Sequence, residues 1–292
     1  MTFDFGSPFP FFSTLVADSF QTARGAAATT PGALALERWV NPAGGSDANA
    51  GGLETPMLTL QAAYDDMVTE AEATASPGAG QSLYMGTIGM YPGQHNVGTG
   101  LVLDPLRPCL FRGAVHIGQS QPDKTTINGQ QIRDITRLGP MSIIHSTSID
   151  PTGLMILDGT SQPGGGFGFQ YITFWVDNDN DNPNDPSNPA LQHNMLGVIY
   201  TRNISEITIR DCQVQTTWNW AGYFINSDAT AADQQDDWII ENVRVQDAGV
   251  IEMQGGQVAR GWQVRQVYSL QHLTVTPNSA FPCFRLLDAE DW

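Results

Sequence analysis

Apolar and polar residues alternate along most of the chain, in short runs bounded by Gly, Pro, Asn and Asp. An alternation with a period of two predicts β-strands that bury one face. Four similar runs each contain a pair of apolar residues, and the first residues of successive pairs are 40, 31 and 30 positions apart. A repeat of this length predicts the stacked units of a solenoid, with the first residue of each pair in one inward-facing column. The four runs place apolar residues in pairs two positions apart: Ile172 and Phe174, Cys212 and Val214, Val243 and Val245, and Leu273 and Val275.

One segment has the periodicity of a helix instead. From Leu60 to Ala71 the apolar residues recur every three or four positions, which predicts an amphipathic helix over residues 59–74. The sequence SPG at 76–78 ends it. An open solenoid end exposes unpaired backbone and core side chains, so we expect this helix to cover the N-terminal end. The residues expected to face inward are Leu60, Ala63, Tyr64, Met67 and Val68.

The order of motifs along the chain resembles a known superfamily. The stretch WVNPAGGSDANAGG is followed by TPMLTLQAAYD, by YPG at 91–93 and by runs such as ITIRDCQV. This order is similar to that of the right-handed parallel β-helix proteins of the pectate-lyase-like superfamily, from about residue 37 onward. The resemblance implies an all-β domain over residues 37–292 with an N-terminal capping helix. It implies little about chemistry, because many functions share this scaffold.

Residues 1–36 have a different character and form the predicted N-terminal arm. Pro8 and Pro10 interrupt the arm and favour an extended chain over a helix. Many aromatic residues in a segment without helix or strand periodicity predict docking on another protein surface. The alternative is an arm that folds back on its own β-helix. Five Phe residues are concentrated here: Phe3, Phe5, Phe9, Phe11 and Phe12.

Charge and composition exclude several partners and sites. The 292-residue chain has a formal net charge of −17, so it would be repelled by a nucleic-acid backbone and by an anionic membrane surface. We expect neither partner, and the sequence has no secretory signal and no apolar run that could span a membrane. The expected place of synthesis is therefore a cytosol. Cys109, Cys212 and Cys283 are too scattered for a disulfide framework or a zinc site, and we expect them in the core.

An acidic run suggests a cation site. DNDNDNPND places carboxylates at Asp177, Asp179, Asp181 and Asp185, directly after the strand that ends in Val176. Alternating Asp and Asn supplies the oxygen ligands that Ca²⁺ prefers. The run departs from a calcium loop, because Asn182 stands where Gly is usual and Asn188 where a bidentate Glu is expected. The alternative is a solvated insertion, and no cofactor is expected to be required.

Aromatic residues in the second half of the chain suggest a carbohydrate surface. Flat aromatic faces stack on pyranose rings, and Asn219 or Asn226 could hydrogen-bond to sugar hydroxyls. The alternative is that several of these rings pack in a wide core or at a subunit interface. The candidate rings are Trp218, Trp220, Tyr223, Trp238 and Trp262.

Catalytic residues cannot be assigned from the sequence. Glycoside hydrolysis needs two carboxyl groups some ~5–9.5 Å apart, and spacing singles out no pair. A pectate-lyase activity is disfavoured, since the chain has one lysine, Lys124, and would repel a polyuronate. The five histidines are scattered and we expect each to be a surface or core residue: His95, His116, His145, His193 and His272. The candidate carboxyls are Asp211, Asp228, Asp236, Asp237, Asp247 and Glu252.

Taken together, these features are similar to those of bacteriophage virion proteins such as tailspikes, tail-fibre components and capsid decoration proteins. Such a protein would assemble in the virion without export, and its arm would attach it to other virion proteins. The resemblance also implies a homotrimer that covers apolar flanks of the solenoid and a possible bacterial surface polysaccharide as ligand. Two alternatives remain: a polysaccharide hydrolase or lyase on the same scaffold, and a cell-surface carbohydrate-binding module.

Overall fold

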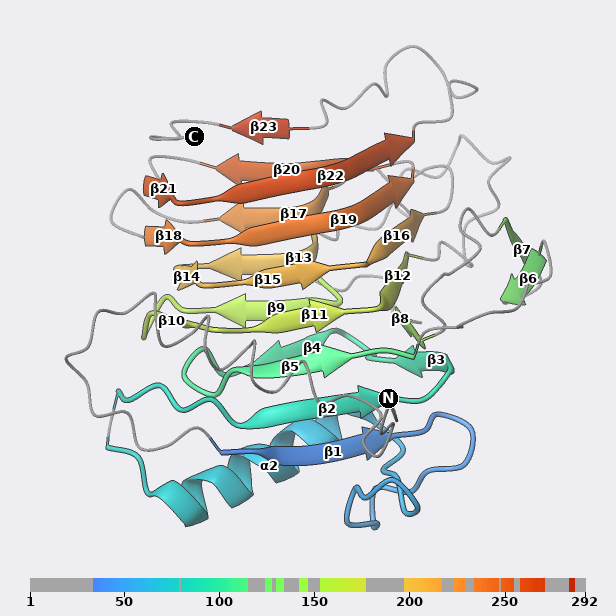
Figure 1. The fold of residues 1–292 in the computed structure, drawn as a ribbon, viewed down its shortest axis with the longest axis vertical. Coiled ribbons are helices and arrows are strands. Elements are labelled where there is room, and N and C mark those ends of the chain that lie inside the picture. The colour runs from blue at the N-terminus through green and yellow to red at the C-terminus, as the bar shows by residue number, and fades with distance from the viewer. Residues whose placement is uncertain are drawn as a thin grey trace, which may run out of the picture.

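The computed structural model consists mostly of β-strands that pair in parallel, with one α-helix among the residues it describes (Figure 1). This agrees with the predicted all-β parallel solenoid. Within the described ranges, no helix combines the length and the apolar character that crossing a membrane requires. The structure describes residues 34–78, 80–114, 124–127, 130–133, 142–146, 153–176, 197–216, 223–228, 234–246, 248–254, 258–270 and 284–286.

The largest sheet has 11 strands in two stacks that merge at β19. The first stack contains β1 (Leu36–Val40), β2 (Gly86–Met90), β5 (Cys109–Arg112), β11 (Gly168–Gln170), β15 (Thr208–Arg210), β19 (Ile239–Gln246) and β22 (Gln263–Leu270). The second stack contains β3 (Gly93–Asn96), β8 (Ser142–His145), β12 (Ile172–Val176) and β16 (Gln213–Thr216), and it joins the C-terminal half of β19.

Six further strands form a second sheet, and short pairs complete the coils. The six-stranded sheet contains β4 (Leu101–Leu103), β9 (Met155–Asp158), β13 (Gly197–Arg202), β17 (Tyr223–Asp228), β20 (Gly249–Gln254) and β23 (Phe284–Leu286). The short parallel pairs are β10 (Gly164–Gly165) with β14 (Ile204–Ser205), and β18 (Gln234–Asp236) with β21 (Val258–Arg260). The remaining pair, β6 (Lys124–Ile127) with β7 (Gln130–Arg133), is antiparallel.

A column of left-handed residues bends the chain between the two stacks of the large sheet. Tyr171, Asp211, Asn242 and Gln266 have φ values of 56°, 54°, 52° and 51°, and the strand register places them in line. Asx residues tolerate this conformation better than most side chains do. The Asn242 amide Nδ2 also donates a 2.6 Å hydrogen bond to Asp211 Oδ1, which connects two successive coils at the bend.

The predicted inward column is confirmed for three of its four residues. Ile172, Cys212 and Val243 are buried, and the pairing of β12, β16 and β19 aligns them. Leu273 lies outside the described residues, and in the next described strand Val243 pairs with Val267 of β22. The repeat shortens in the last coil, since strand pairing fixes the register while the connections vary in length. Burial raises the pKa of the Cys212 thiol to about 12, as expected of a core cysteine.

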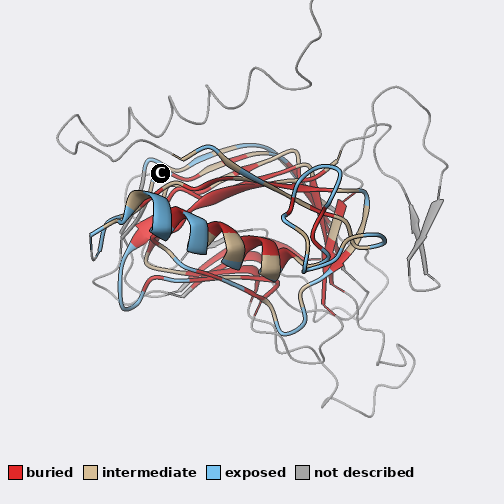
Figure 2. Ribbon diagram, turned by 90° about the horizontal axis from the view of Figure 1, so that it is seen from below, coloured by how far each residue is buried: buried red, intermediate tan, exposed pale blue. Residues whose placement is uncertain are grey.

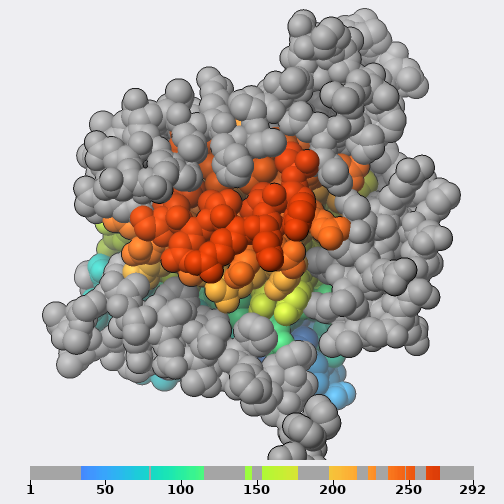
Figure 3. Space-filling model, turned by 45° about the horizontal axis from the view of Figure 1, so that its top comes forward, coloured from blue at the N-terminus to red at the C-terminus, as the bar shows by residue number. Residues whose placement is uncertain are grey.

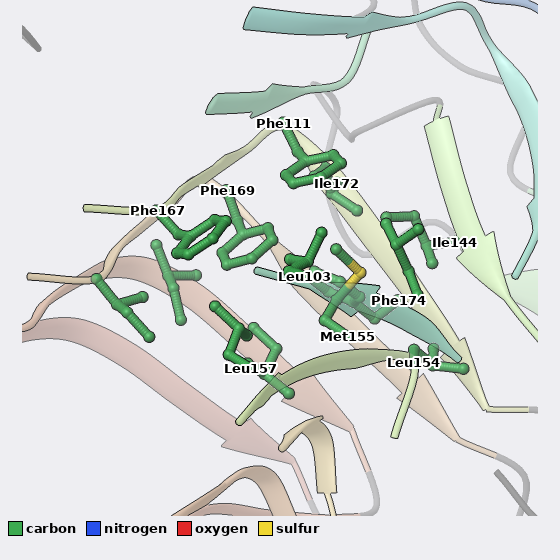
Figure 4. Packing of buried hydrophobic residues seen from close by; sticks show 14 of the residues in the cluster. Leu103, Phe111, Ile144, Leu154, Met155, Leu157, Phe167, Phe169, Ile172 and Phe174 are labelled. Atoms are coloured by element: carbon green, nitrogen blue, oxygen red, sulfur yellow. The ribbon is translucent and has the colours of Figure 1, made fainter. Parts of the chain in front are cut away.

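Aromatic rings link the helix to several coils through the core. Tyr64 stacks on Phe111 at 6.4 Å between ring centroids, and Phe111 stacks on Phe169 at 5.6 Å. Phe169 meets Phe174 edge-on at 6.3 Å, and Phe174 contacts Phe224 at 5.6 Å. Figure 4 shows the middle of this aromatic chain, with Phe111, Phe169 and Phe174 among aliphatic side chains.

The loop before the helix folds back so that the helix can start beside β1. The Asp47 carboxylate accepts hydrogen bonds from the backbone N–H groups of Leu58 and Thr59. Thr59 is the N-cap, and its side chain accepts a hydrogen bond from the Ala62 N–H at 3.2 Å. A Cβ at Gly45 would lie 2.0 Å from the Met57 carbonyl oxygen, so this turn requires glycine.

Helix α2 (Leu60–Ala75) lies across the N-terminal end of the strand stack (Figure 2). Its buried residues are Leu60, Ala63, Tyr64, Met67 and Ala71. Val68, predicted to face inward, is only partly buried against the core. Arg38 of β1 forms ion pairs with Asp66 and Glu70 on the helix.

The opposite end is less covered by the described residues. Among the described strands, β22 pairs with β19 alone. Val264 and Val267 are only partly buried, and Tyr268 is 54% exposed. Figure 3 shows this end, with residues of the last described coils visible in orange and red.

Replacing Val243 by Asp should destabilise the fold strongly. Val243 is fully buried, so the substitution places an unpaired carboxylate in the core. We expect a loss of roughly 3–5 kcal/mol in the free energy of unfolding, measured by urea denaturation. The matched control is Val102→Asp at a 59% exposed position, which should change stability by less than about 0.5 kcal/mol. Equal effects of the two variants would contradict the assignment of Val243 to the core.

Replacing Tyr64 by Phe should weaken the attachment of the helix. The Tyr64 hydroxyl accepts a 2.9 Å hydrogen bond from the Asp104 N–H and lies 3.1 Å from the Arg107 carbonyl oxygen, to which it can donate. We expect a loss of about 1 kcal/mol in thermal or chemical denaturation, because the ring stays in place while the hydrogen bonds are lost. Tyr268→Phe, at an exposed ring, is the control and should have no measurable effect. A neutral Tyr64→Phe would show that the hydroxyl contributes nothing to the attachment.

Candidate functional site

The six-stranded sheet places every second side chain on its outer side. Leu101 and Leu103 of β4 are buried in the core, whereas Val102 between them is 59% exposed. Val102 pairs with Ile156 of β9, and Ile156 pairs with Tyr200 of β13. Tyr200 pairs with Asn226 of β17, and Asn226 pairs with Glu252 of β20. Glu252 pairs in turn with Arg285 of β23, so a row of outward-facing positions crosses all six strands of this sheet.

Three successive polar residues of this row lie on β13, β17 and β20, and we call Tyr200, Asn226 and Glu252 the outer polar row. Their exposed fractions are 7%, 1% and 6%, although they lie on the outer side of the sheet. The Asn226 amide Nδ2 donates a 2.7 Å hydrogen bond to Glu252 Oε2. Asn226 Oδ1 has no hydrogen-bond partner in the described part of the chain. The row thus places a hydroxyl, an amide and a carboxylate on adjacent strands, with little of each side chain in contact with solvent.

The sequence provided only part of this site. Asn226 was a candidate for hydrogen bonding to sugar hydroxyls and Glu252 was a candidate carboxyl, but nothing in the sequence connected them. Ile225 and Ile251 directly precede Asn226 and Glu252, and they are register partners in the core. Aligning these two isoleucines in the sequence would have placed Asn226 beside Glu252 on the outer side. Tyr200 was missed because its run, GVIYTR, contains no alternation of apolar and polar residues.

Two of the predicted carbohydrate-stacking rings follow the core alternative. Trp238 is fully buried, its indole N–H donates to the Ile204 carbonyl oxygen at 2.9 Å, and its ring stacks on Trp262 at 4.4 Å. Tyr223 is only 4% exposed. Because a ring enclosed by protein offers no free face to a sugar, these positions support the core and not the ligand. Trp218 and Trp220 lie outside the described residues.

The acidic run and the two remaining tryptophans leave from neighbouring strands. Val176 pairs with Thr216, and Gly197 pairs with Tyr223. The strands that precede residues 177–196 and 217–222 in the sequence are therefore neighbours, and so are the strands that follow them. The predicted calcium ligands, Asp177, Asp179, Asp181 and Asp185, lie outside the described residues. In the described ranges, no three His, Cys, Asp or Glu side chains are placed to hold a metal ion.

The other candidate carboxyls lie on several elements, and Asp228 occupies a position two residues after Asn226, on the same side of β17. Asp211 lies at the bend of the large sheet and accepts the hydrogen bond from Asn242. Asp236 and Asp237 lie where β18 leads into β19, and Asp237 has a left-handed φ of 60°. Asp228 ends β17, and Asp247 lies outside the described residues.

Two of the five histidines are buried in the described structure. His95 aligns with the core residue Ile144 and is 2% exposed, and burial lowers its pKa to about 4. His145 is 4% exposed at the end of β8. His116, His193 and His272 lie outside the described residues, as do Cys283 and the five Phe residues of the arm, Phe3, Phe5, Phe9, Phe11 and Phe12.

No family model matches this sequence, and no curated protein matches it. Among solved structures, the chain is similar to a rhamnogalacturonan lyase, with a TM-score of 0.34 and 9% sequence identity. The similarity covers 87% of this chain and 66% of the lyase chain, so this chain spans about two thirds of the length of the lyase. At this TM-score the likeness carries no information on the activity or the ligand of this chain.

Proposed function

We propose that this chain is a virion protein of a bacteriophage that binds carbohydrate on the host surface through the outer polar row. Residues 37–292 would form a right-handed parallel β-helix, and residues 1–36 would be the attachment arm. The observation that supports carbohydrate binding is the row itself: Tyr200, Asn226 and Glu252 in register on three adjacent strands. Strands held by neighbours on both sides position side chains more precisely than loops do.

The chemistry of the row suits sugar hydroxyls. A hydroxyl group both donates and accepts hydrogen bonds, and Asn226 Oδ1 is an acceptor without a partner among the described residues. An ionised carboxylate accepts hydrogen bonds and cannot donate them, and Glu252 Oε2 already accepts one from Asn226 Nδ2. A tyrosine beside them adds an aromatic body with a polar tip. Such a mixture of apolar surface and a few fixed polar groups is typical of small-molecule and sugar sites.

The alternative is a polysaccharide hydrolase on the same scaffold, with Glu252 as one of its two carboxyl groups. A binding role is favoured because the Asn226 amide fixes the Glu252 carboxylate, whereas a general acid must carry a proton that it can give away. Only an enzyme would release products from the glycan, so one experiment distinguishes the two.

Other parts of the proposal rest on the sequence. The arm, with Phe3, Phe5, Phe9, Phe11 and Phe12, would dock on another virion protein, since burying each ring could contribute roughly 1.5–3 kcal/mol. A homotrimer would cover apolar flanks of the solenoid. Calcium, if it binds, would do so at Asp177, Asp179, Asp181 and Asp185 and would not be needed for the fold.

The carbohydrate proposal is tested by measuring binding to an array of bacterial surface glycans, together with a reducing-end and unsaturated-product assay. We expect the intact protein to bind without releasing products, and Asn226→Ala and Glu252→Gln to weaken binding about tenfold or more, which corresponds to about 1.4 kcal/mol. Glu54→Gln, in an exposed loop, is the control and should bind normally. Product release that Glu252→Gln abolishes would favour the hydrolase, and no binding to any glycan would reject the proposed function.

The attachment proposal is tested by removing residues 1–20. We expect the truncated chain to keep its far-UV circular dichroism and its thermal midpoint but to be lost from purified particles, because the attachment would reside in the arm. Incorporation at the normal level would show that the flanks of the solenoid make the contact instead.

A further inference from the structure

The tryptophan of β1 lies on the outer side of the large sheet. Trp39 pairs with Gly89 of β2, and Gly89 pairs with Arg112 of β5. The residues just before Gly89 and Arg112 are Ile88 and Phe111, which are register partners and fully buried in the core. Since successive side chains of a strand point to opposite faces, Trp39 and Arg112 point outward, at the end of the stack opposite β22 (Figure 1).

The Trp39 ring lies flat on the backbone of Gly89. A Cβ on Gly89 would lie 2.7, 2.8 and 2.9 Å from the indole atoms Cε3, Cζ3 and Cδ2. Three consecutive ring atoms are nearly equidistant from a point outside the ring only when that point lies above its plane. One face of the indole therefore covers Gly89, where any larger residue would collide with it, and the opposite face points away from the sheet.

A second ring holds Trp39 from the side. Tyr91 meets Trp39 edge-on, with 5.7 Å between ring centroids and an interplanar angle of 71°. The Tyr91 hydroxyl donates a 2.9 Å hydrogen bond to the carbonyl oxygen of Leu53, which is 50% exposed. Both rings are partly exposed. Unlike the enclosed rings of Trp238 and Tyr223, the outer face of Trp39 can thus be reached from solvent without any opening of the fold.

Two charged side chains flank the exposed ring. Glu37 is exposed and lies two positions before Trp39, on the same side of β1. Arg112 lies two strands away from Trp39, at about 10 Å from the usual strand spacing, and it is close enough to Glu37 for their charges to interact. A guanidinium donates hydrogen bonds and a carboxylate accepts them. The apolar ring face therefore has a donor and an acceptor beside it.

We propose that the outer face of Trp39 is a stacking site for a pyranose ring, with Glu37 and Arg112 hydrogen-bonded to the sugar hydroxyls. The apolar C–H face of a pyranose packs on a flat aromatic ring, and its hydroxyls both donate and accept. The site is on the large sheet, so it is separate from the outer polar row of the six-stranded sheet. This inference rests on the proposed carbohydrate-binding function and adds a second site with its ligand class.

A sugar fits this surface better than a proline-rich peptide, which also packs on exposed aromatic rings. Proline has no backbone N–H, so such a peptide offers mainly carbonyl acceptors. These would suit Arg112 and leave Glu37 without a donor, whereas a sugar hydroxyl can serve either residue.

The test uses two variants of the full chain, each with a matched control. Trp39→Ala removes the stacking face, and Glu37→Ala removes an exposed carboxylate and leaves the core intact. The controls are Tyr268→Ala, an exposed ring at the other end of the same sheet, and Glu54→Ala in an exposed loop. Binding is measured on an array of bacterial surface glycans and, in parallel, to immobilised proline-rich peptides. The thermal midpoint of each sugar-free protein is recorded.

We expect the wild-type protein and both controls to bind the same glycan with equal affinity. Trp39→Ala should lose at least about tenfold in affinity, and Glu37→Ala about threefold to tenfold, because stacking and a hydrogen bond are lost respectively. Glu37→Ala should keep its thermal midpoint, since the side chain is exposed. It therefore tests the site even if Trp39→Ala does not fold.

The outcomes separate this inference from the proposed function. Full affinity for glycan in Trp39→Ala, or in Glu37→Ala if Trp39→Ala does not fold, would overturn the second site and leave binding by the outer polar row intact. If the wild-type protein binds no glycan, both proposals are rejected, and binding to the peptides that depends on Trp39 would then identify the surface as a peptide site.

Discussion

Parallel strand pairing between successive coils is the constraint on which the rest of this structure depends. Each strand leaves a backbone edge that only the next coil can satisfy, so the register passes from coil to coil. This register aligns Ile199, Ile225 and Ile251 in the core, and by the same alternation it aligns Tyr200, Asn226 and Glu252 on the outside. The core and the candidate site are therefore two results of one hydrogen-bonding pattern.

The ends of such a stack have no neighbouring coil, so their core side chains must be covered in another way. At the N-terminal end, Asp47 and Thr59 turn the chain into a helix whose apolar face covers the first strands. The ion pairs of Arg38 with Asp66 and Glu70 tie the helix to β1, although partly exposed ion pairs of this kind contribute little stability. The buried face of the helix, which includes Met67 and Ala71, provides most of the attachment.

Sequence patterns predicted the parts of the fold that follow from local periodicity. The helix was expected over 59–74 and lies at Leu60–Ala75, and the alignment of Ile172 with Cys212 and Val243 was predicted from the repeat of similar alternating runs. The pairing of Val243 with Val267 was not predicted, because the connections between coils differ in length and register depends on strand pairing between distant segments. The outer polar row was not predicted as a site, since alternation separates the two sides of a strand but does not reveal which outer residues are shielded.

The aromatic chain from Tyr64 through Phe111, Phe169 and Phe174 to Phe224 has a consequence for cooperativity. In a solenoid with contacts only between nearest neighbours, coils can open one at a time from an end. The ring contacts join the helix to the successive coils that contain β5, β11 and β17. These units are therefore expected to unfold together in one cooperative transition. The coil of β22 contributes no ring to this chain, and its Val264 and Val267 are only partly buried, so opening is expected to start there.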